Sequence, residues 1–272
     1  MLKLSIITVN FNNKEGLQKT IESVVNQTYK NYEYLVIDGG STDGSVEVIK
    51  EYAEKISYWI SESDNGIYNA MNKGILNSKG EYLQFLNSGD WLVNETIIEN
   101  ILHEIPNCDL LYGNMIMVMP NGKLRTSYRS KGAEISFFTL FEGTINHSPS
   151  FIKRSLFLKY GLYDEQLRIV SDWKFFLIAF GLNQSEVVYR NIDVNYFDMN
   201  GISNVQIQLA QSEREKVLSE FVPYPILVDF KKNKRHLFRL TLIRMYFITR
   251  TLNEISELFL TTLARILKKI FD

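Results

Sequence analysis

The sequence predicts an α/β protein built on a mostly parallel sheet, and three observations indicate it. Up to about residue 90, short runs of aliphatic and β-branched residues alternate with segments whose apolar residues recur at helical spacing. The connections between these segments are short, and three of the strand-like runs end in polar turns. Such repetition favours parallel strands joined by right-handed crossovers.

The first half of the chain contains four predicted strands, each a short run rich in Val, Ile, Leu or Tyr. Between them lie segments with helical spacing of apolar residues, the first preceded by Asn12 and Asn13, which can cap a helix. We predict strands at residues 4–9, 34–37, 58–60 and 82–86, and helices near residues 17–25, 46–53 and 70–76.

The second half has a different pattern. Residues 110–119 and 123–128 flank a Pro-Asn-Gly turn, which is typical of a β-hairpin. Helices are predicted near residues 155–160 and from Ser171 onward. From about Ser212 the pattern is largely helical, so we expect a main domain over residues 1–210 and a helical extension over residues 211–272.

Composition limits the class of protein. The 272 residues are 45% hydrophobic and 22% charged, which is ordinary for a soluble globular protein. The single cysteine, Cys108, excludes an intramolecular disulfide and favours a reducing compartment. The N-terminus has no signal-peptide cleavage pattern, and no apolar run approaches the ~20 residues that cross a bilayer. We therefore expect a cytoplasmic protein.

The net charge of −1 is unevenly distributed. From Ile226 to Asp272 there are 10 basic and 4 acidic residues, whereas the preceding part holds 20 and 27. Between Lys231 and Lys269 the basic residues are interspersed with Leu, Ile and Phe, as in a basic amphipathic helix. Such a tail can lie on an anionic membrane surface, or pack on the main domain or on a second subunit in a homodimer. Nucleic-acid binding is not expected, because no recognisable motif accompanies the basic residues.

The polar turns after the predicted strands are the expected site of chemistry, because the carboxyl ends of parallel strands share one edge of a sheet. Asp90 ends the turn Asn87-Ser88-Gly89-Asp90. A carboxylate on a flexible turn suits a hard cation such as Mg²⁺ or Mn²⁺. The alternative is that Asp90 caps a helix beginning at Trp91.

A second acidic turn begins at Asp38 and continues Gly39-Gly40-Ser41-Thr42-Asp43. The glycines permit close backbone approach, and the following helix start can hold an anion. The turn is not a G-x-G-x-x-G sequence and has no P-loop lysine, so those nucleotide-binding motifs are excluded. We expect one of Ser41, Thr42 and Asp43 to cap the next helix, which leaves Asp38 free to contact a base or ribose.

Two further candidates lie in the second half. Asp172 stands near the start of a predicted amphipathic helix, with Ser171 available as its cap, and a carboxylate there can act as a general base. The alternative is that it only favours the helix dipole. His147, one of three histidines, is a candidate pocket residue, with an ordinary hydrogen-bonded histidine as the alternative.

Five segments of the first half carry a recognisable pattern in their order and spacing: Ser5–Asn12, Ser23–Tyr29, Ile37–Ser45, Gly66–Ile75 and Gly80–Asp90. Together they resemble the family 2 glycosyltransferases of the GT-A fold. The resemblance is dense over residues 1 to about 95 and extends more loosely to about 180. It is closest to enzymes of bacterial surface-polysaccharide assembly (capsule, O-antigen or exopolysaccharide).

This resemblance implies a Rossmann-like mixed, mostly parallel sheet flanked by helices, with the C-terminal extension appended. It implies an inverting transfer of sugar from a nucleotide-diphosphate sugar, with UDP as the expected nucleotide, to a hydroxyl of a glycan or lipid-linked glycan. Mn²⁺ or Mg²⁺ is the implied cofactor. The donor half would span residues 1 to about 100 and the acceptor half about 101–210, and the enzyme would work at the inner face of the cytoplasmic membrane if the tail binds lipid.

The resemblance also implies roles for individual residues. Phe11 takes the place of the aromatic that stacks on uracil, Asp90 that of the metal ligand and Asp172 that of the catalytic base, with His147 lining the pocket. Many relatives have a second acid where this chain has Gly39, and Asp64 can compensate for it. Relatives often have Arg at the position of Met71, which shifts the diphosphate contact to Lys73. The predicted nucleotide-sugar site comprises Val9, Phe11, Asp38, Asp64, Lys73 and Ser88.

Two other interpretations compete with this one. A sugar-nucleotide pyrophosphorylase needs a glycine-rich loop with a basic residue after the first strand, and residues 10–13 offer none. A catalytically degenerate binding or scaffold subunit stays open, because the acidic motifs hold fewer carboxylates than in many relatives.

Overall fold

The computed structural model describes residues 3–103, 107–127, 135–183, 185–199 and 206–233. Within them lies a nine-stranded sheet in the order β3-β2-β1-β4-β8-β6-β9-β5, with β7 paired to β6. The strands are β1 (Leu4–Asn10), β2 (Tyr32–Asp38), β3 (Tyr58–Ser61), β4 (Tyr82–Phe85), β5 (Trp91–Leu92), β6 (Leu110–Val118), β7 (Leu124–Ser127), β8 (Ser150–Lys153) and β9 (Val187–Asp198).

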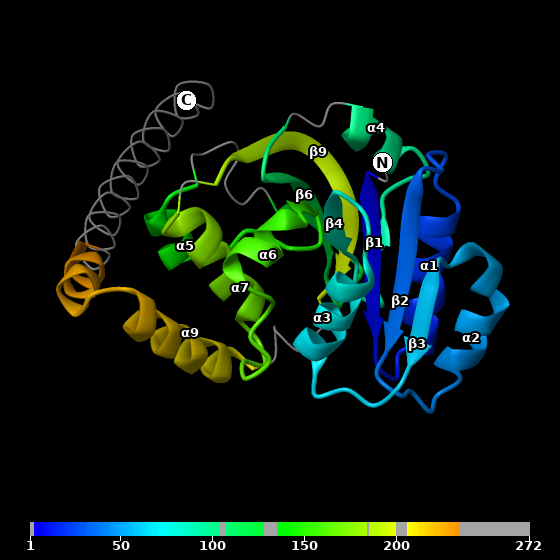
Figure 1. Cartoon of the computed structure of the whole chain (residues 1–272), viewed down its shortest axis with the longest axis horizontal. Helices are drawn as coiled ribbons and strands as arrows, with labels where there is room; N and C mark the ends of the chain where they lie inside the picture. The colour runs from blue at the N-terminus through cyan, green and yellow to red at the C-terminus, as the bar shows by residue number, and fades with distance from the viewer. Residues whose placement is uncertain (1–2, 104–106, 128–134, 184, 200–205, 234–272) are drawn as a thin grey trace, which may run out of the picture. The chain divides into compact units, whose positions relative to one another are not determined.

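Helices flank this sheet (Figure 1). They are α1 (Lys14–Val25), α2 (Ser45–Glu51), α3 (Ile67–Asn77), α4 (Ile97–His103), α5 (Phe137–Glu142), α6 (Ser155–Tyr160), α7 (Ser171–Phe176) and α9 (Ile207–Phe221), with short turns of 3-10 helix at Ala53–Lys55 and of π-helix at Leu177–Gly181.

The first four strands are parallel, with β1 between β2 and β4. All seven residues of β1 are buried, as expected for a central strand covered on both faces. The chain runs outward from β1 to β3 and then returns through α3, which packs against β1 and β2, to place β4 on the other side of β1 (Figure 1). In such sheets the usual place for a ligand is beyond the carboxyl ends of the strands where the strand order reverses, which here are β1 and β4.

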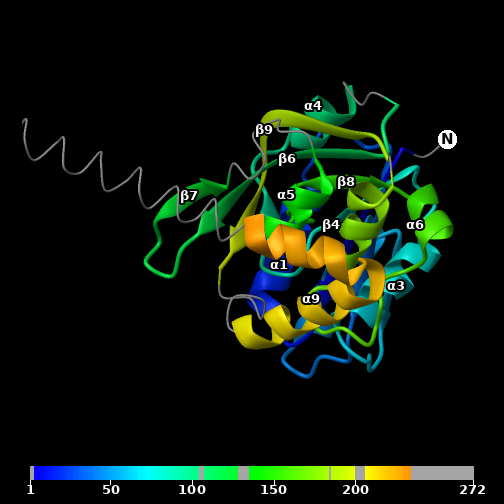
Figure 2. The same ribbon diagram turned by 90° about the vertical axis from the view of Figure 1, so that its left-hand side faces the viewer.

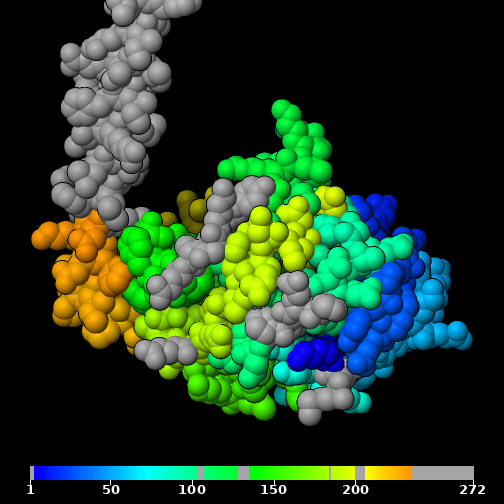
Figure 3. Space-filling view, turned by 90° about the horizontal axis from the view of Figure 1, so that it is seen from above, coloured from blue at the N-terminus to red at the C-terminus, as the bar shows by residue number. Residues whose placement is uncertain are grey.

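The second half converts the sheet into a mixed one. Strand β8 pairs antiparallel with β4 and β6, and β9 pairs parallel with β6 and antiparallel with β5. The long strands β6 and β9 lie side by side. The end of β6 pairs with β7, and this hairpin projects from the rest of the sheet (Figures 2 and 3). The predicted hairpin is confirmed, whereas β8 and β9 have no counterpart in the sequence prediction.

Several local predictions can be compared with the structure. Asn13 caps α1, its side chain accepting a hydrogen bond from the Gly16 N–H. The alternative that Asp90 caps a helix at Trp91 is wrong, because Trp91 and Leu92 form β5 and pair with β9. Ser171 does not cap α7 either, because the residue before it, Val170, holds the N-cap position.

The chain divides into two compact units, residues 1–216 and 217–272. In the second unit, the end of α9 and a helix over residues 224–233 are described. Most of the predicted amphipathic tail lies outside the described residues, and its role stays a prediction. No helix in the described part of the chain is long and apolar enough to span a bilayer.

Candidate active site

The site lies where β1, β2 and β4 end. Asn10 and Asp38 are register partners at the ends of β1 and β2, and the Asn10 amide donates a 2.7 Å hydrogen bond to Asp38. The turn after β4 is attached to the same edge, because the Ser88 N–H donates to the carbonyl of Val9 at 3.0 Å. Asn13, at the start of α1, reaches the Ser88 carbonyl at 3.1 Å. The turns predicted to carry the chemistry therefore share one edge of the sheet.

Asp38 is not free, contrary to the sequence expectation. Its carboxylate is fully buried and accepts hydrogen bonds from Asn10, from the hydroxyls of Ser41 and Ser61, and from the backbone N–H groups of Gly40 and Ser41. Burial raises its pKa, but these hydrogen bonds outweigh burial and hold the pKa below its usual value. Both oxygens are already engaged in fixing the turn.

Phe11, Gly39 and Asp64 lie together beside this turn. The Phe11 ring is 64% exposed, so it offers an open aromatic face. A Cβ on Gly39 would lie 2.5 Å from Oδ2 of Asp64 and 3.2 Å from Cδ2 of Phe11. Oδ1 of Asp64 accepts a hydrogen bond from the Gly66 N–H at 2.9 Å. The Asp64 carboxylate thus fills the space that a side chain at position 39 would occupy.

Lys73 already has an acidic neighbour. Its ammonium group forms a 2.7 Å ion pair with Glu62, which follows β3 and whose side chain is 50% exposed. An ammonium group has three donors, so Glu62 and a diphosphate can share it. The role of Lys73 in contacting a diphosphate stays a prediction.

Asp90 has the opposite surroundings to Asp38. It is 4% exposed, its Oδ1 accepts the Asp198 N–H at 3.2 Å, and its Oδ2 is buried without a hydrogen-bond partner among the described residues. Burial raises the pKa of Asp90 to about 7, while His147 and the Asp198 N–H act in the opposite direction. A buried carboxylate oxygen left without a donor is costly unless a ligand completes it.

Asp172 is held by two side chains from elsewhere in the chain. Its Oδ1 lies 2.9 Å from the Tyr68 hydroxyl on α3, and its Oδ2 lies 3.0 Å from Nδ1 of His147. Burial raises the pKa of Asp172, but the hydrogen bond and the charge of His147 outweigh burial, so the pKa is lowered overall. Asp172 is therefore an ionised carboxylate at neutral pH.

His147 connects Asp172 to the turn that carries Asp90. Because an ionised carboxylate only accepts, Nδ1 carries a proton toward Asp172, and Nε2 lies 3.4 Å from the Asn87 amide nitrogen. Burial lowers the pKa of His147, but Asp172 and then Asp90 outweigh burial and raise it. The predicted pocket histidine, base and metal ligand thus belong to one electrostatic cluster.

Sequence reasoning misses three contributors to this cluster. Tyr68 lies within a recognised motif but has no predicted role. Asn87 is predicted only as a turn residue. Asp198, whose backbone holds Asp90, lies 108 positions away along the chain, and no local pattern marks it.

The described side chains supply only some of the ligands that a divalent cation needs. In the described part of the chain there is no group of three or more His, Cys, Asp or Glu side chains that could hold a metal. Asp90 still offers a buried, unpartnered oxygen, the donor type that Mg²⁺ and Mn²⁺ prefer. One protein carboxylate supplemented by diphosphate oxygens is a usual arrangement for these ions.

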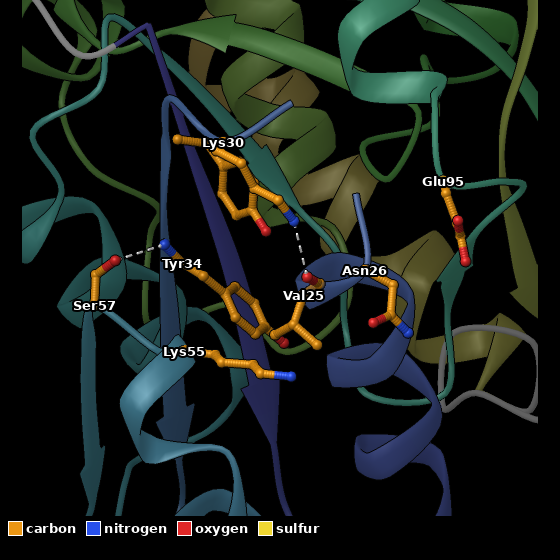
Figure 4. Close-up of a pocket in the computed structure, with 8 residues that line it drawn as sticks. Val25, Asn26, Lys30, Tyr34, Lys55, Ser57 and Glu95 are labelled. Atoms are coloured by element: carbon orange, nitrogen blue, oxygen red, sulfur yellow. Dashed lines mark hydrogen bonds between the residues drawn. The ribbon is translucent and has the colours of Figure 1, made fainter. Parts of the chain in front are cut away.

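A cavity of about 530 Å³ lies away from these residues (Figure 4). It is lined by the end of α1, at Val25, and the start of β2, at Tyr32. These are the amino ends of the strands, so the cavity opens at the edge opposite to Asp38 and Asp90. Figure 4 shows Lys30 donating to the Val25 carbonyl and the Tyr34 backbone N–H donating to the Ser57 hydroxyl there.

Solved structures share this fold. The S. aureus TarS 1–349 chain in complex with UDP superposes with a TM-score of 0.61 at 19% identity, over 72% of this chain and 60% of that chain. The mannosyltransferase PcManGT from Pyrobaculum calidifontis, in complex with GDP-Man and Mn²⁺, gives a TM-score of 0.58 at 14% identity, over 72% and 56%. The present chain spans less than two thirds of either chain. Both are similar in fold, which is the predicted GT-A type.

Sequence relatives give the family. A PGL/p-HBAD biosynthesis glycosyltransferase from Mycobacterium tuberculosis is 30% identical over 207 residues, 74% of this chain and 78% of the relative. An uncharacterised glycosyltransferase from the same organism is 33% identical over 181 residues, 65% and 68% of the two chains. The sequence profile described as "Glycosyl transferase family 2" matches residues 5–159. The chain therefore belongs to glycosyl transferase family 2.

Proposed function

We propose that this glycosyltransferase is inverting and metal-dependent, and that it moves a sugar from a nucleotide-diphosphate sugar to an acceptor hydroxyl. One observation carries the proposal. The ionised carboxylate of Asp172 lies 3.0 Å from His147, whose other ring nitrogen lies 3.4 Å from Asn87, three residues before the unpartnered carboxylate of Asp90. A base and a cation ligand in one cluster are what a direct displacement requires.

Asp172 acts as the general base. A sugar hydroxyl is a very weak acid, so its proton must pass to a nearby base as the oxygen attacks. The acceptor oxygen forms a bond to the anomeric carbon, the bond from that carbon to the donor diphosphate breaks, and the proton moves to Asp172. Attack from the face opposite the diphosphate inverts the anomeric configuration. His147 and Tyr68 orient the carboxylate and keep it ionised.

Asp90 is the proposed cation ligand, together with the diphosphate of the donor. When bound, Mn²⁺ or Mg²⁺ would stabilise the negative charge that gathers on the departing diphosphate. The P. calidifontis mannosyltransferase, solved with both GDP-Man and Mn²⁺, supports a divalent ion in this fold.

The nucleotide is proposed to bind where Phe11 and Asp64 meet over Gly39. The exposed ring can stack on a base, and Oδ2 of Asp64 can accept a hydrogen bond from it. We propose a UDP-sugar as donor. The UDP and UDP-GlcNAc complexes of TarS support this choice. The P. calidifontis mannosyltransferase has the same fold and was solved with GDP-Man, so UDP- and GDP-sugars need to be compared.

The acceptor is proposed to be a glycan or lipid-linked glycan in bacterial cell-surface polysaccharide assembly. The mycobacterial relatives named for PGL/p-HBAD biosynthesis support a bacterial biosynthetic setting. Contact with the inner face of the cytoplasmic membrane through the basic tail, and a homodimer, belong to the same proposal. Co-sedimentation of the full chain with anionic liposomes tests the membrane contact, and equal recovery without liposomes would contradict it.

Asp172→Asn tests the mechanism. The amide oxygen still accepts from His147, and the Tyr68 hydroxyl can accept from the amide nitrogen, so the fold is retained. Donor binding, followed by thermal shift across nucleotide sugars with and without Mn²⁺, should be nearly unchanged. Turnover should fall about 100-fold or more. Glu47→Gln, an exposed carboxylate on α2, is the matched control.

Two outcomes would contradict the proposal. Near-normal turnover by Asp172→Asn would show that Asp172 is not the base. An NMR spectrum of the product with the same anomeric configuration as the donor would show that the transfer is not inverting. The alternative of a degenerate binding subunit predicts donor binding with neither transfer nor Mn²⁺-dependent hydrolysis of the donor.

A further inference from the structure

Glu213 on α9 binds a row of backbone groups next to the proposed base. The residue is 8% exposed, and its carboxylate accepts hydrogen bonds from three consecutive N–H groups. The donors are Arg168 at 2.7 Å, Ile169 at 3.0 Å and Val170 at 3.2 Å. Val170 is the residue immediately before α7, whose second residue is Asp172.

Three successive N–H groups that converge on one point form a concave anion site. Here the anion is supplied by the chain itself, so the segment is fixed by hydrogen bonds to a full charge, which are stronger than neutral ones. Without the carboxylate, three consecutive backbone donors, of which that of Val170 is buried, would lose their acceptor together. Glu213 therefore determines where the backbone before α7 lies.

That backbone is connected to Asp172 through Tyr68. The Tyr68 hydroxyl lies 2.7 Å from the carbonyl oxygen of Ile169 and 2.9 Å from Oδ1 of Asp172. A hydroxyl has one proton, so the position of the Ile169 carbonyl influences how strongly Tyr68 donates to Asp172. The neighbour of Glu213 adds a second contact, because the Arg214 guanidinium lies 4.7 Å from the Trp173 ring centre.

We propose that Glu213 is a positioning residue for the general base. It acts through residues 168–170 and Tyr68 to hold the Asp172 carboxylate in the orientation in which it takes the proton of the acceptor hydroxyl. This inference depends on the proposed function of Asp172. It assigns to α9, which follows the sheet in sequence, a part in the chemistry of the site.

Glu213→Gln is the direct test. The amide keeps the size of the side chain but replaces one acceptor oxygen with an NH₂ group that faces backbone donors. We expect kcat to fall about 10-fold or more, because a small displacement of a base is costly. The donor KM should stay within about twofold, since the nucleotide site is not touched. Glu215→Gln, exposed on the same helix, is the matched control.

A double-mutant cycle separates positioning from a general loss of stability. If Glu213 acts through the base, adding Glu213→Gln to Asp172→Asn leaves kcat unchanged relative to Asp172→Asn alone. A merely structural role would lower kcat by the same factor in both backgrounds. Each kcat is calculated per donor-binding site, counted by titration, so misfolded protein does not contribute to it.

The outcomes are distinguishable. Equal losses in both backgrounds, or no loss of kcat in Glu213→Gln, overturn the positioning role while the base assignment stands. Near-normal turnover of Asp172→Asn overturns two claims: that Asp172 is the general base, and that Glu213 acts through it. If Glu213→Gln does not fold, Glu213→Asp, which keeps the charge but withdraws it by one methylene, takes its place in the same cycle.

Discussion

Asp38 and Asp90 are the same chemical group at the same edge of the sheet, and their surroundings are opposite. Asp38 accepts from five donors and its pKa is lowered despite burial. Asp90 accepts from one backbone group, keeps a buried oxygen without a partner among the described residues, and has a pKa raised to about 7. The comparison shows that hydrogen bonds within the protein satisfy Asp38, whereas Asp90 keeps the oxygen that we propose binds a cation.

The difference arises from where the donors come from. The turn after β2 folds back on itself, so Gly40 and Ser41 bring donors within three residues of Asp38. The turn after β4 leads instead into β5, whose pairing with β9 brings the Asp198 backbone to Asp90 and little else. Asp38 receives three hydrogen bonds from its own turn and two more from Asn10 and Ser61 at the ends of β1 and β3, whereas Asp90 receives one.

The largest expected effect is on catalysis at Asp90. Asp90→Asn should lower kcat/KM by about 1,000-fold, because removing the ligand of the cation removes stabilisation of the departing charge. Transfer rates measured across a Mn²⁺ titration, with Glu47→Gln as control, check this. Activity within about tenfold of the unaltered enzyme at saturating Mn²⁺ would mean that Asp90 is not the ligand.

The next effect is on stability at Asp38. Asp38→Asn should lower the free energy of unfolding by about 3 kcal/mol, because the amide nitrogen cannot accept from the buried donors that the carboxylate now serves. Urea unfolding at pH 7.5 is the measurement. The comparison of the two turns fails if Asp38→Asn is no more destabilising than Asp90→Asn.

A smaller effect is the pH dependence of stability caused by Asp90. Its folded pKa of about 7 lies above its ordinary value of 3.8. Below about pH 4 the Asp90 carboxyl is protonated in both the folded and the unfolded protein. As the pH rises toward 7, Asp90 ionises in the unfolded protein but stays protonated in the folded one, so the free energy of unfolding falls. Above pH 7 Asp90 is ionised in both states and the loss is constant.

The stability of Asp90→Asn relative to the unaltered protein should therefore be about 3 kcal/mol greater at pH 8 than at pH 5. Two pH units separate pH 5 from the folded pKa, and each corresponds to about 1.4 kcal/mol. Free energies of unfolding of both proteins from pH 4 to pH 8, without metal, provide the test. A difference that does not grow with pH would contradict the raised pKa.

The smallest effect concerns Gly39 and Asp64. Gly39→Asp should weaken donor binding about tenfold, because even its Cβ would lie 2.5 Å from Oδ2 of Asp64. The double variant Gly39→Asp with Asp64→Gly should recover part of the loss, since it moves the acid to the neighbouring position. Calorimetry measures the donor dissociation constants of the single and double variants. If the losses of binding free energy in the two single variants simply add in the double variant, the two positions do not share one site.

Much of the fold of residues 1–100 could be predicted from the sequence. The four parallel strands, the Asn13 cap and the polar turns after β1, β2 and β4 follow from short-range periodicity and turn residues. The strands β8 and β9 have no counterpart in the sequence prediction. In β9 polar and apolar residues alternate over residues 191–196, as in a strand, but only Val194 and Asn195 of its twelve residues are fully buried, and its pairing with β6 and β5 has no local signature.

What the sequence by itself determined is the identity of the chemical groups and the strands that carry them, because those depend on neighbours a few residues apart. Only the tertiary structure decided which carboxylates are satisfied and which are not. The contacts of Asp172 with Tyr68 and His147, of Asp90 with Asp198, and of Glu213 with the backbone before α7 span 25 to 108 positions. Hydrogen bonds over such separations have no local signature, and they set the pKa values on which the chemistry depends.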